Sequence, residues 1–257
     1  MDGKKVNKDI YEDYYKSVSL FKTTSPGNRW LFYLIRELFK GIDASSVGSI
    51  LDVGCGEGSK TFFLKGQFAG ARVLGIDFSA SGIEAATDAA DAGVEFRCVD
   101  VEDLSVWDDK FDLISCLGVL EHVVDWKGLL DRIVESSNNY VLIEVPIGRM
   151  RKFEANVGHL RNFAKHEIEW YLLEHGFVPV KVFYAGFPFF SPISRDLGNL
   201  LYRFYHENIE SVNESTVLTR LYSSVMYFLF RFCSSRYRFG DQFLGLFRRD
   251  VTRETIL

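Results

Sequence analysis

The sequence predicts an α/β protein built on a doubly wound, mostly parallel sheet. From Ile50 onward, short apolar runs alternate with segments whose apolar residues recur at helical spacing, which is typical of a parallel sheet covered on both faces. The first run leads into a glycine turn at residues 54–58. Asp52, Asp77 and Asp100 stand at the ends of the first three runs, and open α/β sheets bind ligands beyond the carboxyl ends of their strands.

The elements follow from periodicity and from start and stop signals. Pro26 suits the first turn of a helix whose apolar face runs from Trp30 to Phe39, and Gly41 ends it. Ser79 is a suitable N-cap for an alanine-rich helix. The strands are expected at 50–53, 72–76, 94–98, 111–116, 139–145 and 178–184, with helices at 57–66, 80–91, 126–136 and 165–175.

Composition limits the class of protein. A chain of 257 residues suits one domain with an appendage, and its 47% hydrophobic content can fill a core. The net charge of −5 argues against a nucleic-acid partner, which usually needs a basic face. The N-terminus lacks the apolar region of a signal peptide, and no apolar run reaches the roughly 18 residues of a membrane span.

The four cysteines show no metal-binding spacing. Cys55, Cys98, Cys116 and Cys233 form no C-x-x-C pair. We therefore expect buried, reduced thiols, as in a cytoplasmic protein.

The glycine turn indicates a nucleotide-like ligand. Gly54, Gly56 and Gly58 form G-x-G-x-G before a helix, and glycines allow the backbone a close approach to a ligand at the positive end of the helix dipole. The dinucleotide fingerprint G-x-G-x-x-G requires a third glycine where Ser59 stands. This difference argues against a nicotinamide-dependent oxidoreductase. Asp77, at the tip of the second strand, can accept two hydrogen bonds from a ribose diol.

Four motifs in order resemble class I S-adenosylmethionine-dependent methyltransferases. They are D-V-G-C-G-E-G, G-I-D-F-S, V-D-V-E-D-L and F-D-L-I-S-C-L-G-V-L-E-H-V, and the resemblance covers roughly residues 50–249. It implies a seven-stranded Rossmann-like methyltransferase fold with an antiparallel last strand at 241–248. It also implies S-adenosyl-L-methionine as cofactor. The implied cofactor-binding residues are Asp52, Gly54, Cys55, Gly56, Gly58, Asp77, Phe78, Asp100, Val101, Cys116 and Leu117.

The resemblance gives several of these residues a role. Asp100 would hydrogen-bond the adenine amino group, or only cap nearby backbone. Phe78 and Val101 could hold the adenine between apolar surfaces, although Phe78 also suits the core. Cys116 and Leu117 would line the methionine end of the cofactor.

Glu121 and His122 are candidate catalytic residues. Methyl transfer needs alignment above all, and a base only if the acceptor must lose a proton. A histidine beside a carboxylate suits that task, but the pair could equally only shape the loop. L-E-H is similar to ubiquinone-biosynthesis O-methyltransferases, in which Glu-x-x-Glu-His binds a divalent metal. Gly118 stands where the first Glu would be, so we expect no metal.

His159 is the third candidate. Gly158-His159-Leu160-Arg161-Asn162-Phe163 resembles the acceptor-side loop of a methyltransferase subfamily common in quinone and polysaccharide pathways. His159 would contact the acceptor, and a structural histidine is the alternative. Glu144 could pair with Arg161 or face the cleft.

About fifty residues before the last strand form an insert. It holds two expected helices, near 193–206 and 215–233, and from Gly186 to the end there are nine Arg, no Lys and seven acidic residues. We divide the chain into an N-terminal helical segment over the cofactor site (1–45), a methyltransferase domain (46–186 and 237–250) and a helical cap (187–236). The cap could cover the acceptor cleft, form a dimer surface, or lie in a membrane interface.

Together these features predict a methyltransferase that acts on a small molecule or glycan precursor, most plausibly at an oxygen, as in polysaccharide biosynthesis. The alternatives are a catalytically silent cofactor-binding partner module and, less favoured, an NAD-dependent oxidoreductase. We expect a cytoplasmic monomer or homodimer without a nucleic-acid partner. A peripheral contact with the inner face of the membrane, through residues 187–236, follows if the cap lies in an interface.

Overall fold

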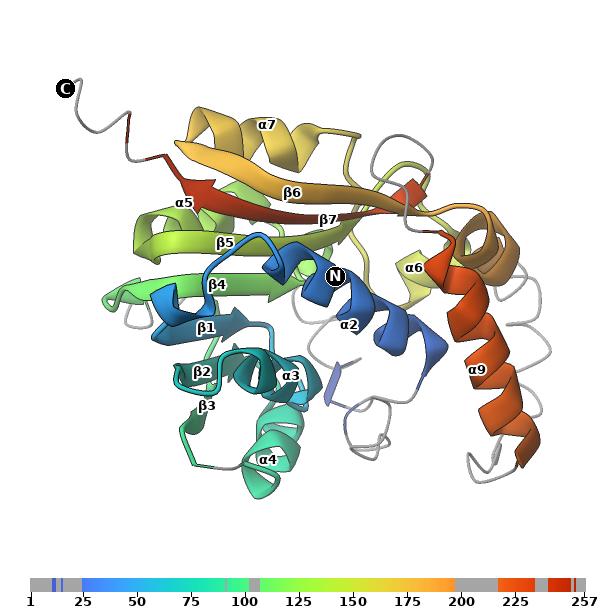
Figure 1. Cartoon of the computed structure of the whole chain (residues 1–257), viewed down its shortest axis with the longest axis horizontal. Coiled ribbons are helices and arrows are strands. Elements are labelled where there is room, and N and C mark those ends of the chain that lie inside the picture. The colour runs from blue at the N-terminus through green and yellow to red at the C-terminus, as the bar shows by residue number, and fades with distance from the viewer. Residues whose placement is uncertain are drawn as a thin grey trace.

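Figure 1 shows the computed structural model of the chain, which describes residues 11, 12, 15, 25–90, 92–101, 107–196, 217–233, 240–250 and 252. Its centre is a seven-stranded sheet in the order β3-β2-β1-β4-β5-β7-β6. The strands are β1 Ser49–Val53, β2 Arg72–Asp77, β3 Val94–Cys98, β4 Phe111–Leu117, β5 Ser137–Pro146, β6 Phe177–Gly186 and β7 Gly240–Arg249. β1 to β5 pair in parallel, and β7 runs antiparallel to both neighbours. The predicted fold class is confirmed.

Helices cover both faces of this sheet (Figure 1). They are α2 Pro26–Phe39, α3 Ser59–Gln67, α4 Ala80–Asp88, α5 Trp126–Ser136, α6 Lys152–Asn156, α7 Glu167–Glu174 and α9 Val217–Arg231, with 3-10 turns η2 Ala44–Ser46 and η4 Leu120–His122 and the π-helical segment η5 Phe189–Ser194. Ser79 caps α4 as predicted, because its hydroxyl accepts from the Gly82 amide. α4 ends three residues before the predicted position, and α6 was not predicted. Most of the expected 193–206 helix lies outside the described residues.

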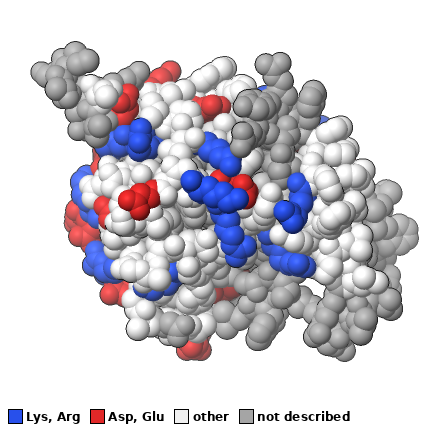
Figure 2. Space-filling model, in the orientation of Figure 1, with Lys and Arg blue, Asp and Glu red and all other residues white. Residues whose placement is uncertain are grey.

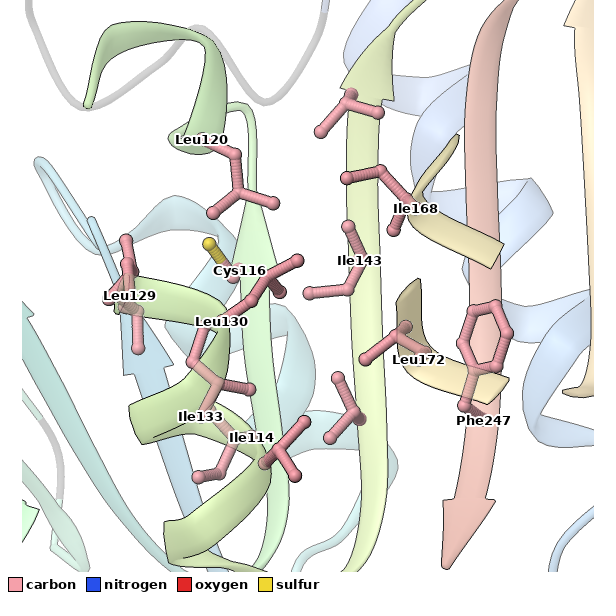
Figure 3. Close-up of a cluster of buried hydrophobic side chains, with 14 of the residues drawn as sticks. Ile114, Cys116, Leu120, Leu129, Leu130, Ile133, Ile143, Ile168, Leu172 and Phe247 are labelled. Carbon is pink, nitrogen blue, oxygen red and sulfur yellow. The ribbon is translucent and has the colours of Figure 1, made fainter. Parts of the chain in front are cut away.

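Two apolar cores result, one on each face of the sheet. In the first, α5 and α7 pack on β4, β5 and β7, and Figure 3 shows Leu130 and Ile133 of α5 and Leu172 of α7 directed at the sheet. In the second, α2, α3 and α9 pack on the opposite face. Neighbouring residues of a strand therefore enter different cores.

Three of the four cysteines lie in the protein interior. Cys55, Cys116 and Cys233 are buried, but Cys98 is exposed at the end of β3, which corrects the expectation that all four thiols are buried. Among the described helices, none is long and apolar enough to cross a bilayer.

Candidate functional site

The glycine turn joins β1 to α3 at the point where the strand order reverses. Gly54, Gly56 and Gly58 have φ values of 72°, 55° and 83°, a region that residues with a Cβ rarely adopt. The amides of Gly54 and Cys55 both donate to the Ile76 carbonyl, at 2.8 and 3.0 Å. The turn is therefore fixed to the tip of β2.

Asp77 closes this turn from the end of β2. One carboxylate oxygen accepts from the Gly56 amide at 2.9 Å, and the other accepts from the Ser79 amide at 2.8 Å. The side chain is 5% exposed, and burial raises its pKa. Since a carboxylate oxygen can accept two hydrogen bonds, these contacts leave Asp77 with capacity for a ligand hydroxyl.

Asp52 lies beneath the turn rather than on its surface. Its carboxylate accepts from Thr61 Oγ1 at 2.6 Å and from the Ser115 hydroxyl, and Ser115 is its registered partner on β4. The residue is 1% exposed, and burial raises its pKa. This geometry favours a role in fixing α3 and β4 beneath the turn over the direct cofactor contact that the motif suggested.

Three other predicted cofactor residues also have buried side chains. Cys55, Cys116 and Leu117 are at most 4% exposed. The Cys116 sulfur points into the core toward Leu120 (Figure 3), and Leu117 belongs to the core on the other face. A contact with the cofactor from these three residues would come from the main chain, and their cofactor-binding role stays a prediction.

The predicted adenine-binding residues follow β2 and β3. The Val101 carbonyl accepts from Arg132 at 2.8 Å and from Trp107 at 3.0 Å, which fixes the backbone beside Asp100. Phe78 is half-buried, and its ring meets Tyr11 edge-on at 6.1 Å between centroids. Their roles toward adenine stay predictions.

Two of the described N-terminal residues lie against the glycine turn and the start of α4. A Cβ at Gly56 would be 2.2 Å from the Tyr15 hydroxyl, and one at Gly82 would be 3.1 Å from the Tyr15 ring. Glu12 accepts from the Ala80 amide at 2.7 Å and from the Ser81 hydroxyl at 2.7 Å, at the start of α4. A carboxylate is favourable at a helix N-terminus. The sequence indicated a helix here, but not that Tyr15 would sit against Gly56.

Two buried carboxyl groups meet a lysine beyond β4 and β5. A Cβ added to Gly118 would lie 3.3 Å from a carboxylate oxygen of Glu144, 3.6 Å from Lys60 Nζ and 3.7 Å from a carboxylate oxygen of Glu121. Lys60 donates to the Leu117 carbonyl at 2.5 Å. Burial and the nearby Glu144 charge raise the pKa of Glu121 to about 8. Thus a glutamate from β5 reaches the space beside Gly118, a position that motif comparison alone does not give.

Two histidines adjoin this carboxyl pair. His122 Nδ1 lies 3.0 Å from the Gly158 carbonyl and Nε2 lies 3.0 Å from the Tyr11 hydroxyl. Because a carbonyl can only accept, Nδ1 carries the proton, and Nε2 accepts from Tyr11. Burial and the neighbouring His159 lower the pKa of His122 to about 4. Burial and Arg195 lower that of His159 to about 4 as well, so both rings are neutral at pH 7.

Two buried polar atoms of this group have no hydrogen-bond partner among the described residues, one on Glu121 and Nδ1 of His159. The two imidazole rings pack edge to face, with centroids 4.7 Å apart. Ligand atoms of Glu121, His122 and His159 all lie within 4.8 Å of one another. The structure thus brings the three predicted catalytic residues together. Their donor set would also suit a divalent ion, so the expected independence of metal stays a prediction.

Of the two alternatives for Glu144, the structure does not show the pair with Arg161. Arg161 donates to the Val123 and Val124 carbonyls and does not pair with Glu144, which instead accepts from Gln242 of β7. Behind His159, Arg195 pairs with the fully buried Glu154 of α6.

Arg151 extends this ionic network. Its guanidinium lies 2.6 Å from Asp241 and 2.5 Å from Asp196. Arg195 also lies 3.5 Å from Asp241. These charges join residues 195 and 196, at the start of the insert, to Arg151, to α6 and to the start of β7.

Glu121→Gln should stabilise the protein at alkaline pH. The folded protein holds the Glu121 proton up to about pH 8, whereas an unfolded glutamate loses it near its ordinary pKa of 4.5, so stability falls as pH rises between these values. One pKa unit corresponds to about 1.4 kcal/mol, so we expect the variant to gain about 4 kcal/mol in unfolding free energy at pH 8 and almost nothing at pH 4.5. Urea titrations across this range measure it. The exposed Glu135→Gln is the control, and an equal gain in both variants would refute the assignment.

Comparisons with known proteins agree with this geometry. Residues 50–138 match the family model described as Methyltransferase domain. The chain is 42% identical over 88 residues to a ubiquinone biosynthesis O-methyltransferase of Nitrobacter winogradskyi, a match that covers 32% of each chain. It is 34% identical over 96 residues to a malonyl-[acyl-carrier protein] O-methyltransferase of Acetivibrio thermocellus, over 37% of this chain and 34% of the other. The matches thus span about a third of these relatives' length.

Solved structures resemble the chain over a larger part. Magnesium protoporphyrin IX methyltransferase from Synechocystis PCC 6803 with bound SAM gives a TM-score of 0.59 at 15% identity, over 97% of this chain and 98% of that one. The [4+2]-cyclase SpnF gives 0.57 at 16% identity, over 86% and 81%. At these identities the likeness shows the fold. These findings agree on a methyltransferase domain at residues 50–138 and on the Rossmann-like methyltransferase fold for the sheet that contains it.

Proposed function

We propose that the protein is an S-adenosylmethionine-dependent methyltransferase that modifies an oxygen of a small-molecule or glycan-type acceptor. The observation that carries the proposal is the position of Asp77 and Gly56, joined by a 2.9 Å hydrogen bond at the β1–β4 switch point. Ligands of open α/β sheets bind at this point. The curated relatives named above are O-methyltransferases, which favours oxygen.

The residues present fit the cofactor. Gly56 has no Cβ, so a flat ring can lie directly against its backbone. In this structure the Tyr15 side chain occupies that space. Asp77 retains acceptor capacity for a ribose diol. Because Tyr15 lies over the same backbone, cofactor binding would require this side chain to give way. We propose that the N-terminal residues close over the bound cofactor.

The acceptor would be deprotonated by His122. S-adenosylmethionine, when bound, supplies an activated methyl group on a sulfonium. The Gly158 carbonyl holds the proton on Nδ1 and directs the Nε2 lone pair outward, toward the Tyr11 hydroxyl. An acceptor hydroxyl that takes the place of Tyr11 would donate to the same lone pair. Glu121 and His159 each keep a buried atom for further contacts with the acceptor.

A catalytically silent cofactor-binding module is the second candidate. Tyr11 occupies His122 Nε2, and Tyr15 covers the glycine turn, an arrangement that would also suit a protein that binds cofactor without turnover. Binding of cofactor with no methyl transfer to any phenol, sugar or thiol would favour it. Ser59, in place of the third dinucleotide glycine, leaves the NAD-dependent alternative without a supporting observation.

Asp77→Ala should weaken binding of S-adenosylhomocysteine by about 1–3 kcal/mol, the range for losing charge-assisted hydrogen bonds. Isothermal titration calorimetry measures it. Asp77→Asn, which keeps one acceptor oxygen, should fall between Ala and the parent. A thermal melt separates a local effect from unfolding, because Asp77 also holds the Gly56 amide. Undiminished affinity in a folded Asp77→Ala variant would refute the site, and no binding by the parent protein would refute the function.

A further inference from the structure

The outer side of α9 carries an exposed apolar stripe. Leu221, Val225, Phe228 and Phe232, the residue just after the end of α9, are between 49% and 66% exposed. Their spacing of four, three and four residues places them on one side of the helix. The opposite side of α9 is buried, as Phe230 shows at 2% exposure. An ordinary surface helix is polar on its outer side, so contiguous exposure of two phenylalanines and two aliphatic residues indicates an interaction surface.

Arginines border this stripe along the contact between α9 and α2. Arg29 lies over the Tyr227 ring at 4.3 Å, and Arg231 lies over the Tyr33 ring at 4.7 Å. Figure 2 shows Lys and Arg over α2 toward its boundary with α9, with fewer acidic atoms among them. α9 contains two arginines and no acidic residue in its sequence. This face is therefore locally basic, although the whole chain has a net charge of −5.

We propose that this face, defined by the α9 stripe and its arginine border, binds the surface of an anionic phospholipid membrane. Aromatic and aliphatic side chains enter the acyl boundary, and guanidinium groups pair with lipid phosphates. With 15 residues, α9 is shorter than the roughly 20 residues that cross a bilayer, so it lies along the interface.

Charge favours a membrane over a second copy of this chain. A second copy would offer the same surface, on which Glu37, the acidic residue near Arg231, is already paired with Lys40 and Lys181, and hence little opposite charge. An anionic leaflet offers phosphates over its whole area, each nearby basic residue contributing to attraction. The buried Phe230 and the ring contacts of Arg29 and Arg231 hold α9 against α2, so the stripe is presented without unfolding of the helix.

Vesicle flotation of the full chain tests the proposal. The parent protein should float with vesicles of phosphatidylcholine containing about one third phosphatidylglycerol, and should be released by high salt because lipid attraction of basic residues is screened. Pure phosphatidylcholine vesicles should retain much less. Phe228→Ser with Phe232→Ser should reduce partitioning by about tenfold or more. Trp170→Ser, at an equally exposed aromatic residue of α7, should leave it unchanged.

The possible results distinguish membrane binding from self-association and from an effect on the cofactor site. Absence of the parent protein from anionic vesicles, or equal flotation of the double variant, overturns the proposal. A parent dimer in light scattering that the double variant makes monomeric, without vesicle binding, assigns the stripe to self-association instead and also overturns it. Calorimetry with S-adenosylhomocysteine in the absence of vesicles should give one affinity for the parent and the double variant. Loss of that affinity would bear on the cofactor site and not on this surface.

Discussion

Replacing His122 with glutamine should reduce kcat by about 10²–10⁴-fold, the usual contribution of a positioned general base. Glutamine can still donate to the Gly158 carbonyl but has no nitrogen lone pair to accept the acceptor proton. Affinity for S-adenosylhomocysteine should change little, since His122 lies beyond β4 and not at the glycine turn. Stopped assays of S-adenosylhomocysteine release, with catechol as the acceptor probe, measure the rate. His175→Gln, at the exposed histidine that follows α7, is the control.

The pH profile gives a second readout for the same residue. The pKa of His122 is lowered to about 4, so the base form dominates above that value, and kcat/KM should fall only as pH drops through about 4. An acid limb near 6.5 would show that the working histidine is not buried in this way.

Chelation separates a base from a metal ligand. If Glu121, His122 and His159 act without metal, activity should survive exhaustive dialysis against EDTA. A loss on chelation that equals the loss in His122→Gln, restored by Mg²⁺ or Zn²⁺, would show that the three donors, which lie within 4.8 Å of one another, hold an ion. Intact activity in His122→Gln would refute both roles.

The fold was predictable because the short apolar runs of strands and the one-sided apolar pattern of helices can be told apart over long segments. Apolar runs of four to seven residues and amphipathic helices alternate from Ile50 to Gly186, and only a parallel sheet accommodates that order simply. α6 was missed because five residues, Lys152–Asn156, are too few for a periodic signal. Its stability derives from the buried Glu154, which Arg195 reaches from 41 positions away.

The direction of side chains at the site was less predictable. A parallel strand is covered on both faces, so alternation does not tell which residue meets a ligand. Asp52 and Cys116 stand at the ends of strands, as expected, yet each points into a packed layer. Glu144 was ambiguous for the same reason, and only the pairing of β5 with β7 brings Gln242 to its carboxylate. Tyr15 lies at the site because of a tertiary contact, which no local sequence pattern predicts.

Gly54→Ala should abolish measurable cofactor binding and cost about 2–3 kcal/mol of stability, from left-handed backbone strain together with overpacking. Gly54 has φ of 72°, and a Cβ there would lie 2.3 Å from Cγ2 of Val119. The methyl group would therefore push apart the turn and the loop after β4, which carry the two halves of the site. Calorimetry with S-adenosylhomocysteine and urea unfolding measure the two effects.

Two further variants separate the causes of that loss. Gly66→Ala lies in α3, where a Cβ would meet nothing within 4 Å, so it should keep binding and gain up to about 1 kcal/mol from helix propensity. Gly54→Ala combined with Val119→Ala removes the collision but keeps the strained φ, so it should recover part of the affinity. If it recovers none, strain of the turn alone decides binding. If Gly54→Ala itself binds like the parent, the turn does not contact the cofactor, because a displaced backbone at Gly54 also displaces the Gly56 amide from Asp77.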